Sequence, residues 1–419
     1  MRFYFPDSQD QIDPSFDFLT EDGSPFRIRQ RDDLYAHEIL DPTPYTGMLV
    51  SKAIVDGIAG GAGRYSAQQR QRLYREGIRT FLRLDRAGGP RMDTLGDCGA
   101  FTYVRDDVPP FSVDEVIDFY EGCGFDAGLS VDHVILGYEE HAPLSDELLP
   151  PEWPKRQKLT LDLAVEFLAR HQERACSFEP VGVAQGWSPH SYAQAVKRLQ
   201  EIGYTRIALG GLVPLKTHEI LSLLSAVSEH RLPSTELHLL GVTRCENVGA
   251  FRDFGVTSFD STSPFRQAFK DERDNYYALD RTWLALRVPQ VEGNQTLMRR
   301  IQAGEIDQGV ARRHEKHALS TLNVFDAGTV DVEDAVKALQ SYEQIYDGKR
   351  DRSAQYREVL SAAPWKHCGC QVCAQAGIHA IVFRGSERNK RRGFHNLHVF
   401  ARQLAREVGY ANDRDAVEA

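Results

Sequence analysis

Short apolar strands alternate with amphipathic helices through the middle of this chain, and the alternation predicts an α/β fold with a parallel sheet. The connections are short and there are eight candidate strands, which together indicate a closed (β/α)8 barrel of the TIM type. An open, doubly wound sheet is the alternative arrangement. The candidate strands are 47–53, 79–84, 92–96, 128–132, 181–185, 206–210, 237–241 and 256–260.

The helix-like stretches between the strands repeat apolar residues at helical spacing. The stretch 191–202 places Ala195, Val196, Leu199 and Ile202 on one face, and 218–227 has the same pattern. Each stretch would bury that face against the sheet, as a barrel helix does.

Most candidate strands end in acidic, amide or glycine residues. The carboxyl ends of barrel strands converge on one mouth, where catalysis takes place in this fold. A pair of carboxylates there suits displacement at a sugar carbon, with one acting as nucleophile and the other as acid/base. Bare glycines let a flat ligand lie against the backbone. The strand-end residues are Asp97, Asp132, Gln185, Gly210, Gly211, Gly241 and Asp260.

A dense group of metal-ligand residues follows the barrel pattern. Cys368, Cys370 and Cys373 lie within one turn, and His395 follows on a predicted helix. Three thiolates and an imidazole fill a tetrahedral Zn²⁺ site completely, so the sequence predicts a structural zinc. The rival nitrogen ligands are His367, His379 and His398.

The composition of the chain excludes some classes of protein and predicts a cellular location. The 419 residues carry a net charge of −10, which argues against a protein that coats nucleic acid along its whole surface. No apolar run is long enough to cross a membrane, and Met1–Asp7 lacks the apolar core of a signal peptide. Seven cysteines, three of them already assigned to zinc, form no disulfide framework, so we expect a cytoplasmic protein.

Two basic runs depart from the acidic average. Eight arginines and only two acids lie between Arg64 and Arg91. In the second run glycine, serine and asparagine are interspersed, which is typical of a loop that presents N–H and guanidinium groups to phosphates. Its basic residues are Arg384, Arg388, Lys390, Arg391 and Arg392.

The ordered motifs resemble those of the tRNA-guanine transglycosylase superfamily. They are the segments 124–132, 185–186, 208–212, 240–243 and 258–266, followed by Cys-x-Cys-x-x-Cys and His-Asn-Leu. The resemblance runs from about Gly47 to Glu407. It implies a (β/α)8 barrel with a zinc-binding subdomain inserted before the last barrel helix. It also implies exchange of guanine in a nucleic acid for a 7-deazaguanine through a covalent glycosyl-enzyme.

The resemblance implies a role for each residue at the mouth. Asp260 resembles the nucleophile that attacks the sugar C1′, and Asp97 resembles the general acid/base that manages the proton on N9. Asp132 matches the carboxylate that accepts from N1–H and the exocyclic amine of the buried purine. The other base-binding residues would be Gln185 and the Gly211 amide for O6, their neighbours Gly210 and Leu212, and Phe101 and Leu240 around the ring.

Other features resemble the DNA-modifying branch, which inserts 7-cyano-7-deazaguanine (preQ0) into DNA. They are the basic string 384–395 and the opening segments 4–7 and 32–38. Where the tRNA enzymes have Val-Gly-Glu, this chain has Val213-Pro-Leu, and the missing acid suits a neutral nitrile. Their Asp-Ser-Gly-Gly is here Asp97-Cys-Gly-Ala, which leaves the contacts behind that aspartate open.

We therefore expect a DNA-guanine transglycosylase that uses preQ0, with Arg266 and the second basic run on the DNA backbone. The alternatives are a tRNA-guanine transglycosylase and a non-catalytic, zinc-stabilised nucleic-acid-binding subunit. A glycosidase of free sugars would have no use for the base-reading edge. Flipping a guanine out of a duplex suggests help from a partner, and the resembling bacterial enzymes are accompanied by an ATPase. The oligomeric state stays open.

The expected domain boundaries follow from the same resemblance. They are an N-terminal extension at 1–46, the barrel core at 47–300, the zinc-binding subdomain at 301–394, and the last barrel helix with the C-terminal tail at 395–419.

Overall fold

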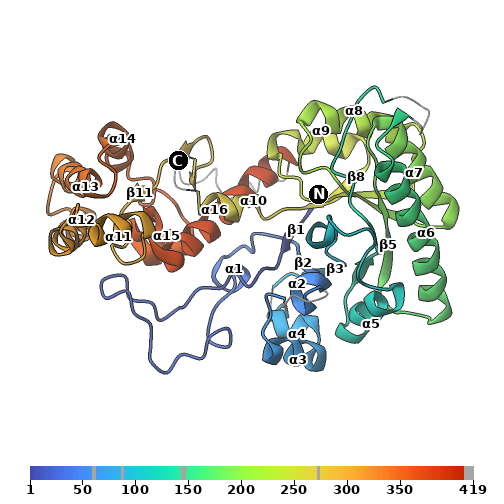
Figure 1. Ribbon diagram of the computed structural model, residues 1–419, viewed down its shortest axis with the longest axis horizontal. Coiled ribbons are helices and arrows are strands. Elements are labelled where there is room, and N and C mark those ends of the chain that lie inside the picture. Colours follow the sequence, from blue (N-terminus) through green and yellow to red (C-terminus); the bar gives the residue numbers. More distant parts are fainter. Residues whose placement is uncertain (59–62, 86–88, 143–147, 271–273, 410–419) are drawn as a thin grey trace. The chain divides into compact units, whose positions relative to one another are not determined.

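A computed structural model of the 419-residue chain describes residues 1–58, 63–85, 89–142, 148–270 and 274–409 (Figure 1). The chain divides into two compact units. The barrel unit comprises Met1–Gln9, Tyr45–Thr262 and the chain from Leu404, and the second unit comprises Asp10–Pro44 and Ser263–Gln403. The end of the predicted tail, 410–419, lies outside the described residues.

Eight parallel strands form a closed barrel, which confirms the predicted (β/α)8 fold. The barrel closes where the first strand pairs with the eighth, with Tyr4 opposite Asp260. In sequence order the strands are β1 (Arg2–Pro6), β2 (Gly47–Ser51), β3 (Asp93–Asp97), β4 (Ala127–Leu129), β5 (Glu179–Ala184), β6 (Arg206–Leu209), β7 (Glu236–Leu239) and β8 (Val256–Asp260).

One predicted strand is wrong, and one barrel strand was not predicted. The stretch 79–84 belongs to helix α4 (Ile78–Leu82), where Ile78, Phe81 and Leu82 are buried at the i, i+3, i+4 spacing of one helix face. The first barrel strand is instead β1, inside the segment 1–46 that was predicted to precede the barrel. Its five residues bury Phe3, Tyr4 and Phe5 in succession, without the alternation that marks a half-exposed strand.

Helices follow the strands and cover the barrel. α7 shows why the sequence folds this way: Ser188 caps it, Pro189 stands in its first turn and Gly203 ends it with a φ of 119°. Its buried face carries the predicted Ala195, Val196 and Leu199. The helices of this unit are α2 (Lys52–Asp56), α3 (Ala67–Glu76), α4, η1 (Ala100–Tyr103), α5 (Val113–Cys123), α6 (Glu152–Glu173), α7 (Pro189–Ile202), α8 (Thr217–Ser228), η3 (Cys245–Asn247) and α9 (Val248–Asp253).

The barrel interior is a packed core that supports the mouth. Leu49, Leu95, Leu129 and Val183 belong to its cluster of buried side chains, and Leu240 packs against that cluster. On the outer side, Tyr120 of α5 lies so close to the sheet that a Cβ on Gly96 or Gly128 would come within 2.3 Å of its ring. No side chain could be accommodated at either glycine without moving the helix.

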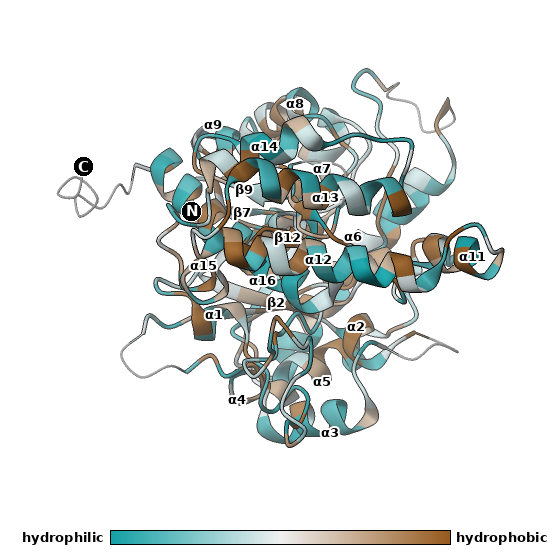
Figure 2. Cartoon of the chain, turned by 90° about the vertical axis from the view of Figure 1, so that its left-hand side faces the viewer, coloured by the Kyte–Doolittle hydropathy of each residue, from teal (hydrophilic) through white to brown (hydrophobic). Residues whose placement is uncertain are grey.

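The second unit is mostly helical, and it differs from the predicted subdomain at 301–394 because it includes Asp10–Pro44 and begins at Ser263. Figure 2 shows hydrophilic and hydrophobic residues interleaved along α12 and α13, as expected for helices with one buried face. Its elements are α1 (Ala36–Ile39), α10 (Ser263–Gln267), β9 (Tyr276–Tyr277), β10 (Thr282–Trp283), β11 (Leu286–Arg287), α11 (Gln295–Gln302), α12 (Gln308–Asp326), α13 (Val332–Tyr346), α14 (Ser353–Ala362), α15 (Gln371–Ala376), η4 (Gly377–Ala380), β12 (Val382–Phe383) and α16 (Gly385–Glu407).

Helix α16 contains the predicted last barrel helix but begins ten residues earlier than the predicted start at His395, so it also carries most of the second basic run. Its last residues, from Leu404, count with the barrel unit. Within the described parts of the chain, no helix is both long and apolar enough to cross a membrane.

Candidate functional site

The structure brings the predicted mouth residues to the carboxyl ends of consecutive barrel strands. Asp97 is the last residue of β3 and Asp260 is the last residue of β8. Asp132 follows β4, and Gln185 directly follows β5. Gly210, Gly211 and Leu212 follow β6, and Leu240 directly follows β7.

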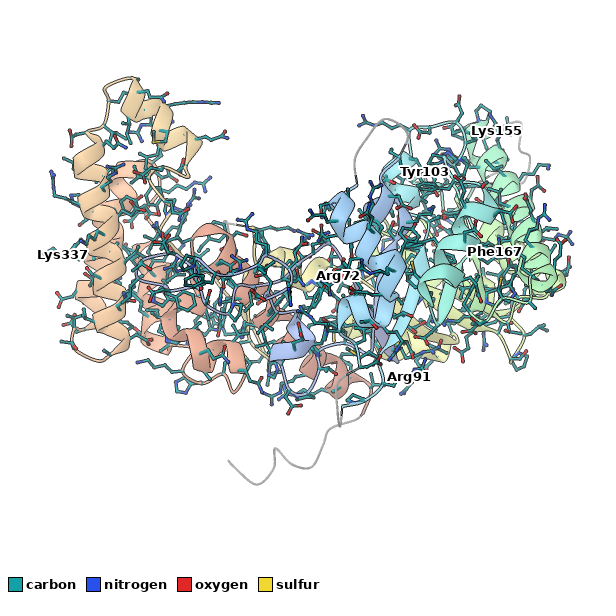
Figure 3. All side chains as sticks on the ribbon, turned by 90° about the horizontal axis from the view of Figure 1, so that it is seen from below. Arg72, Arg91, Tyr103, Lys155, Phe167 and Lys337 are labelled. Atoms are coloured by element: carbon teal, nitrogen blue, oxygen red, sulfur yellow. The ribbon has the colours of Figure 1, made fainter. Side chains whose placement is uncertain are left out.

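Asp132 is buried and held by two side-chain donors. Gln185 Nε2 donates to its Oδ2 at 2.6 Å, and the Cys98 thiol donates to its Oδ1 at 3.2 Å. The orientation of the Gln185 amide is fixed because its Oε1 accepts from the Ile135 N–H at 3.2 Å. The Tyr103 hydroxyl lies 3.0 Å from Cys98 Sγ, so it supports the thiol from behind (Tyr103 is labelled in Figure 3). Cys98, the residue that replaces the serine of the tRNA enzymes, and Tyr103 thus support Asp132.

The two carboxylates nearest Cys98 differ in proton affinity. Burial, and then the charge of Asp132, raises the pKa of Asp97 to about 7. Burial also raises the pKa of Asp132, but the hydrogen bonds from Cys98 and Gln185 oppose it and leave the value at about 6. Near neutral pH, Asp97 can therefore take up and release a proton, while Asp132 is mostly an anionic acceptor.

Asp260 is buried and fixed through one of its oxygens. Its Oδ1 accepts from the Gly241 N–H at 3.1 Å and lies 3.2 Å from Nε2 of His238. His238 lies on β7, and its Nδ1 is 2.9 Å from the hydroxyl of Ser258.

The β6 turn presents backbone to the mouth. Gly211 adopts a φ of 73°, and a Cβ there would lie 2.4 Å from the Ile135 carbonyl oxygen. The Tyr192 hydroxyl donates to the Gly210 carbonyl at 2.7 Å and holds the turn from outside. Phe101, on η1, is 51% exposed, while Leu240 is partly buried against the core. That these two enclose a ring stays a prediction.

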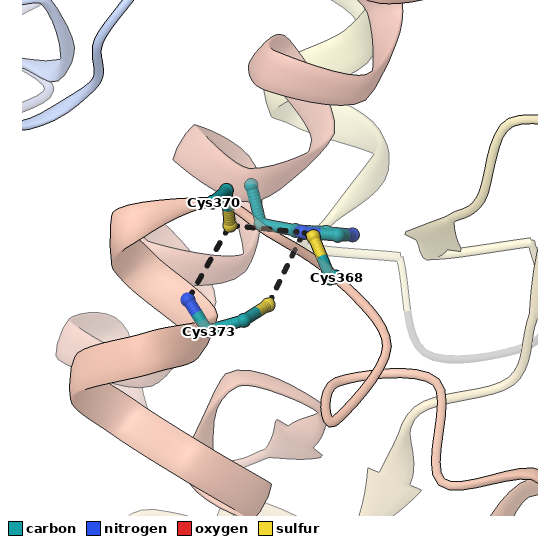
Figure 4. Close-up of side chains that lie close together, drawn as sticks. Cys368, Cys370 and Cys373 are labelled. Atoms are coloured by element: carbon teal, nitrogen blue, oxygen red, sulfur yellow. Dashed lines mark hydrogen bonds between the residues drawn. The ribbon is translucent and has the colours of Figure 1, made fainter. Parts of the chain in front are cut away.

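The predicted zinc ligands come together in the second unit (Figure 4). Nδ1 of His395 lies 3.5 Å from Cys368 Sγ, 3.6 Å from Cys370 Sγ and 3.3 Å from Cys373 Sγ. A tetrahedron with metal–sulfur bonds of about 2.3 Å and a metal–nitrogen bond of about 2.0 Å has N···S edges of about 3.5 Å. The four residues could therefore hold a metal ion.

The choice of the nitrogen ligand follows from the second contact of the ring. Nε2 of His395 lies 2.8 Å from the Tyr277 carbonyl oxygen, which accepts its proton and leaves the Nδ1 lone pair for a metal. The ring of Tyr276 stacks on that of His395 at 3.9 Å. Of the rivals, His379 stacks on Phe18, and neither it nor His398 belongs to the cluster.

The prediction that the second basic run forms a phosphate-binding loop is wrong. Apart from Arg384, the run lies in the first turns of α16, where the segment 10–44 covers it. The four arginine residues are between 0% and 7% exposed, so a phosphate cannot reach them. Their partners and that of the lysine are Glu21 and Glu315 for Arg384, Glu21 for Arg388, the Gln11 carbonyl for Lys390, Glu387 and the Asp13 carbonyl for Arg391, and the Val382 carbonyl and Asn389 for Arg392.

The remaining basic residues are more accessible. Arg266, on α10, lies 3.3 Å from Asp10 with 39% of its side chain exposed, and its role on DNA stays a prediction. In the run from Arg64, Arg72 and Arg75 both pair with Glu76, and 73% of the Arg75 side chain is exposed (Arg72 is labelled in Figure 3). Arg86 lies outside the described residues.

Sequence reasoning missed His238, Ser258 and Tyr103. His238 and Ser258 lie in barrel strands of four and five residues, and Tyr103 lies in the four-residue helix η1, and elements this short give little periodic signal. The only available signal was the alternation on β8, which places Ser258 and Asp260 on the same face.

No protein-family model matches the chain. A curated relative, named DNA-guanine transglycosylase, from Salmonella montevideo, is 47% identical over 409 residues. The aligned region is 96% of this chain and 96% of the relative, so it extends over both units.

Proposed function

This chain belongs to the DNA-guanine transglycosylase family, and from that premise we propose that it exchanges guanine in DNA for preQ0 through a covalent glycosyl-aspartate. The single observation that supports the chemistry best is the set of three carboxylates at the barrel mouth, where Asp97 and Asp132 carry raised pKa values of about 7 and about 6.

In the first half of the proposed reaction, Asp260 attacks C1′ of the flipped nucleotide. A bond forms between a carboxylate oxygen and C1′ as the C1′–N9 bond breaks, and Asp97 supplies the proton that N9 needs to leave as neutral guanine. In the second half, Asp97 removes the proton from N9 of preQ0. N9 then attacks C1′, and the ester bond to Asp260 breaks.

Recognition of the base would rest on the buried polar edge beside these carboxylates. Asp132 accepts from N1–H and the exocyclic amine, and one Gln185 N–H already holds Asp132 in place at 2.6 Å. The second N–H of Gln185 and the Gly211 amide are then available for O6. The neutral turn at Val213 supplies no acid for a cationic substituent, which favours the nitrile.

We also propose that the ion held by Cys368, Cys370, Cys373 and His395 is Zn²⁺. All four tetrahedral positions are filled by soft sulfur and imidazole ligands, so the ion would stabilise the second unit and take no part in the exchange. A cytoplasmic location agrees with seven cysteines that form no disulfide. An ATPase partner that opens the duplex would provide the energy for flipping.

The test compares nucleosides in digested DNA and digested tRNA from cells with the wild-type protein, with Asp260→Asn, or with neither, by mass spectrometry. A 7-deazaguanine nucleoside should appear only in the DNA of cells with the wild-type protein, because the side-chain amide of Asp260→Asn cannot form the glycosyl ester. Modified tRNA with unmodified DNA would replace this proposal with the tRNA alternative. Exchange by Asp260→Asn near the wild-type rate would move the nucleophile to Asp97.

A further inference from the structure

The hydrogen bonds around Asp260 distinguish its two oxygens. Oδ1 receives the Gly241 N–H and faces His238 Nε2, whereas no described residue makes a hydrogen bond to Oδ2. Both contacts come from β7 and the turn after it, a strand that is hydrogen-bonded to β8 along its length. The carboxylate is therefore held through Oδ1, and none of the described residues occupies Oδ2 with a hydrogen bond.

The environment of His238 decides which ring nitrogen carries the proton. A carboxylate only accepts, so Nε2 must donate to Asp260, and Nδ1 must then accept from the Ser258 hydroxyl at 2.9 Å. Burial lowers the pKa of His238, with Arg206 and Arg2 acting in the same direction and Asp260 opposing. The ring of Tyr4 completes the surroundings, edge-on at 5.7 Å. The imidazole is therefore neutral and leaves the negative charge of the carboxylate intact.

We infer that His238 is a positioning residue for the nucleophile Asp260. Together with the Gly241 amide it holds Oδ1 by hydrogen bonds, so that Oδ2 is the oxygen that attacks C1′. The inference rests on the proposed covalent reaction. When the Oδ2–C1′ bond forms and C1′–N9 breaks, Oδ1 becomes the ester carbonyl oxygen. When preQ0 N9 displaces the ester, the returning charge is shared with Oδ1, where two fixed donors stabilise it. His238 keeps its proton throughout.

Two amide variants isolate the donor at Nε2. In His238→Gln the side-chain nitrogen reaches about as far as Nε2, whereas in His238→Asn it reaches only about as far as Nδ1. Both variants are neutral and leave polar atoms in the same buried position. A loss of activity that is equal in the two variants would therefore reflect altered packing and not the missing donor. The assay follows formation of the protein–DNA adduct in a single turnover, together with kcat, KM for preQ0 and the thermal midpoint.

His238→Asn should lower kcat and the rate of adduct formation about 10- to 100-fold, with KM for preQ0 unchanged because His238 does not touch the base. His238→Gln should recover most of that loss. Wild-type rates in His238→Asn, or equal losses in both variants, would overturn the inference. If His238→Asn does not fold, Ser258→Ala removes the donor to Nδ1 and should slow the adduct severalfold; an unchanged rate overturns the inference equally.

The same assay separates this inference from the proposed reaction. If Asp260→Asn still exchanges the base at the wild-type rate, the covalent proposal has failed whatever the His238 variants do. If Asp260→Asn is inactive while His238→Asn is unaffected, the covalent proposal stands and only the role of His238 is rejected.

Discussion

At the scale of single residues, Asp97 shows how a raised pKa links stability to chemistry. Burial and then Asp132 raise its pKa from 3.8 to about 7. Between about pH 4 and pH 7 the folded protein holds a proton here that the unfolded chain has released, so the free energy of unfolding falls as pH rises through that window.

Asp97→Asn should therefore raise the thermal midpoint at pH 8, where wild-type Asp97 is ionised, and change it much less at pH 4, while base exchange is lost. Thermal unfolding of both proteins at the two pH values measures the effect. Asp253→Asn, which alters an exposed acid at the end of α9, is the control and should show no such pH-dependent gain. A midpoint of Asp97→Asn below that of the wild type at pH 8 would contradict this account.

Asp132→Asn should weaken binding of preQ0. The new side-chain amide would place its N–H group opposite an N–H group of the base, which needs an acceptor there. A buried unmet pairing costs about 1–3 kcal/mol, which corresponds to about 5- to 150-fold in Kd. Calorimetric titration with preQ0 measures it. Cys98→Ser is the matched control, since a hydroxyl still donates to Asp132 and affinity should stay within about threefold. Equal affinity in Asp132→Asn would show that this carboxylate does not read the base.

At the scale of elements, ion pairs with two buried arginines attach the segment 10–44 to the start of α16 and to the residue before it. Glu21 pairs with Arg384 at 2.5 Å and also with Arg388. Burial raises the pKa of Glu21, but hydrogen bonds from Arg384 and Gln290 outweigh it and lower the pKa to about 2. Glu21 thus contributes stability above about pH 4.5, and that contribution is lost as pH falls toward 2.

Glu21→Gln should destabilise the protein at pH 7, by about 1–2 kcal/mol after allowance for solvent screening, because two buried guanidinium groups lose their shared counter-charge. The difference from the wild type should shrink between pH 4.5 and pH 2.5. Denaturant unfolding across this range measures it, with Asp22→Asn at the exposed neighbouring position as the control. If the difference in unfolding free energy between the two proteins grows as the pH falls, the ionised form of Glu21 is not what stabilises the fold.

The metal cluster is also a property of elements, because it ties the turn before α15 to α16. Cys370→Ala should remove one equivalent of zinc and lower the thermal midpoint by at least about 5 °C, since metal binding adds to folding energy. Metal analysis and thermal unfolding measure both effects. Cys176→Ala, at a cysteine outside the cluster, should change neither. Full zinc content in Cys370→Ala would reject the ligand set.

At the scale of the whole molecule, periodicity predicted the barrel, since seven of its strands coincide with predicted stretches. The strand-end residues followed because β/α order alone directs Asp97, Asp132 and Asp260 to one mouth. The side chains that contact those residues could not be predicted from the sequence. That His238 lies beside Asp260 depends on the register between β7 and β8, which includes a shift at Leu237 and His238.

The basic run shows why exposure could not be predicted from composition. Their composition suggests that Arg388 and Arg392 are surface charges, yet both are buried. Arg388 pairs with Glu21, which lies more than 350 positions earlier in the chain, and Arg392 donates to backbone carbonyls such as that of Ala268. Local sequence carries no trace of such distant partners.

The pairing of β1 with β8 also has a consequence for how the protein is made. Residues 2–6 leave the ribosome long before their partners at 256–260, which are synthesised only after most of the barrel. Until then β1 pairs with β2 alone and has no neighbour on its other side. The last ring of hydrogen bonds therefore forms late and joins sequence-distant segments, which makes closure a slow folding step. A nascent chain that stalls before β8 would expose two strand edges open to association with other chains.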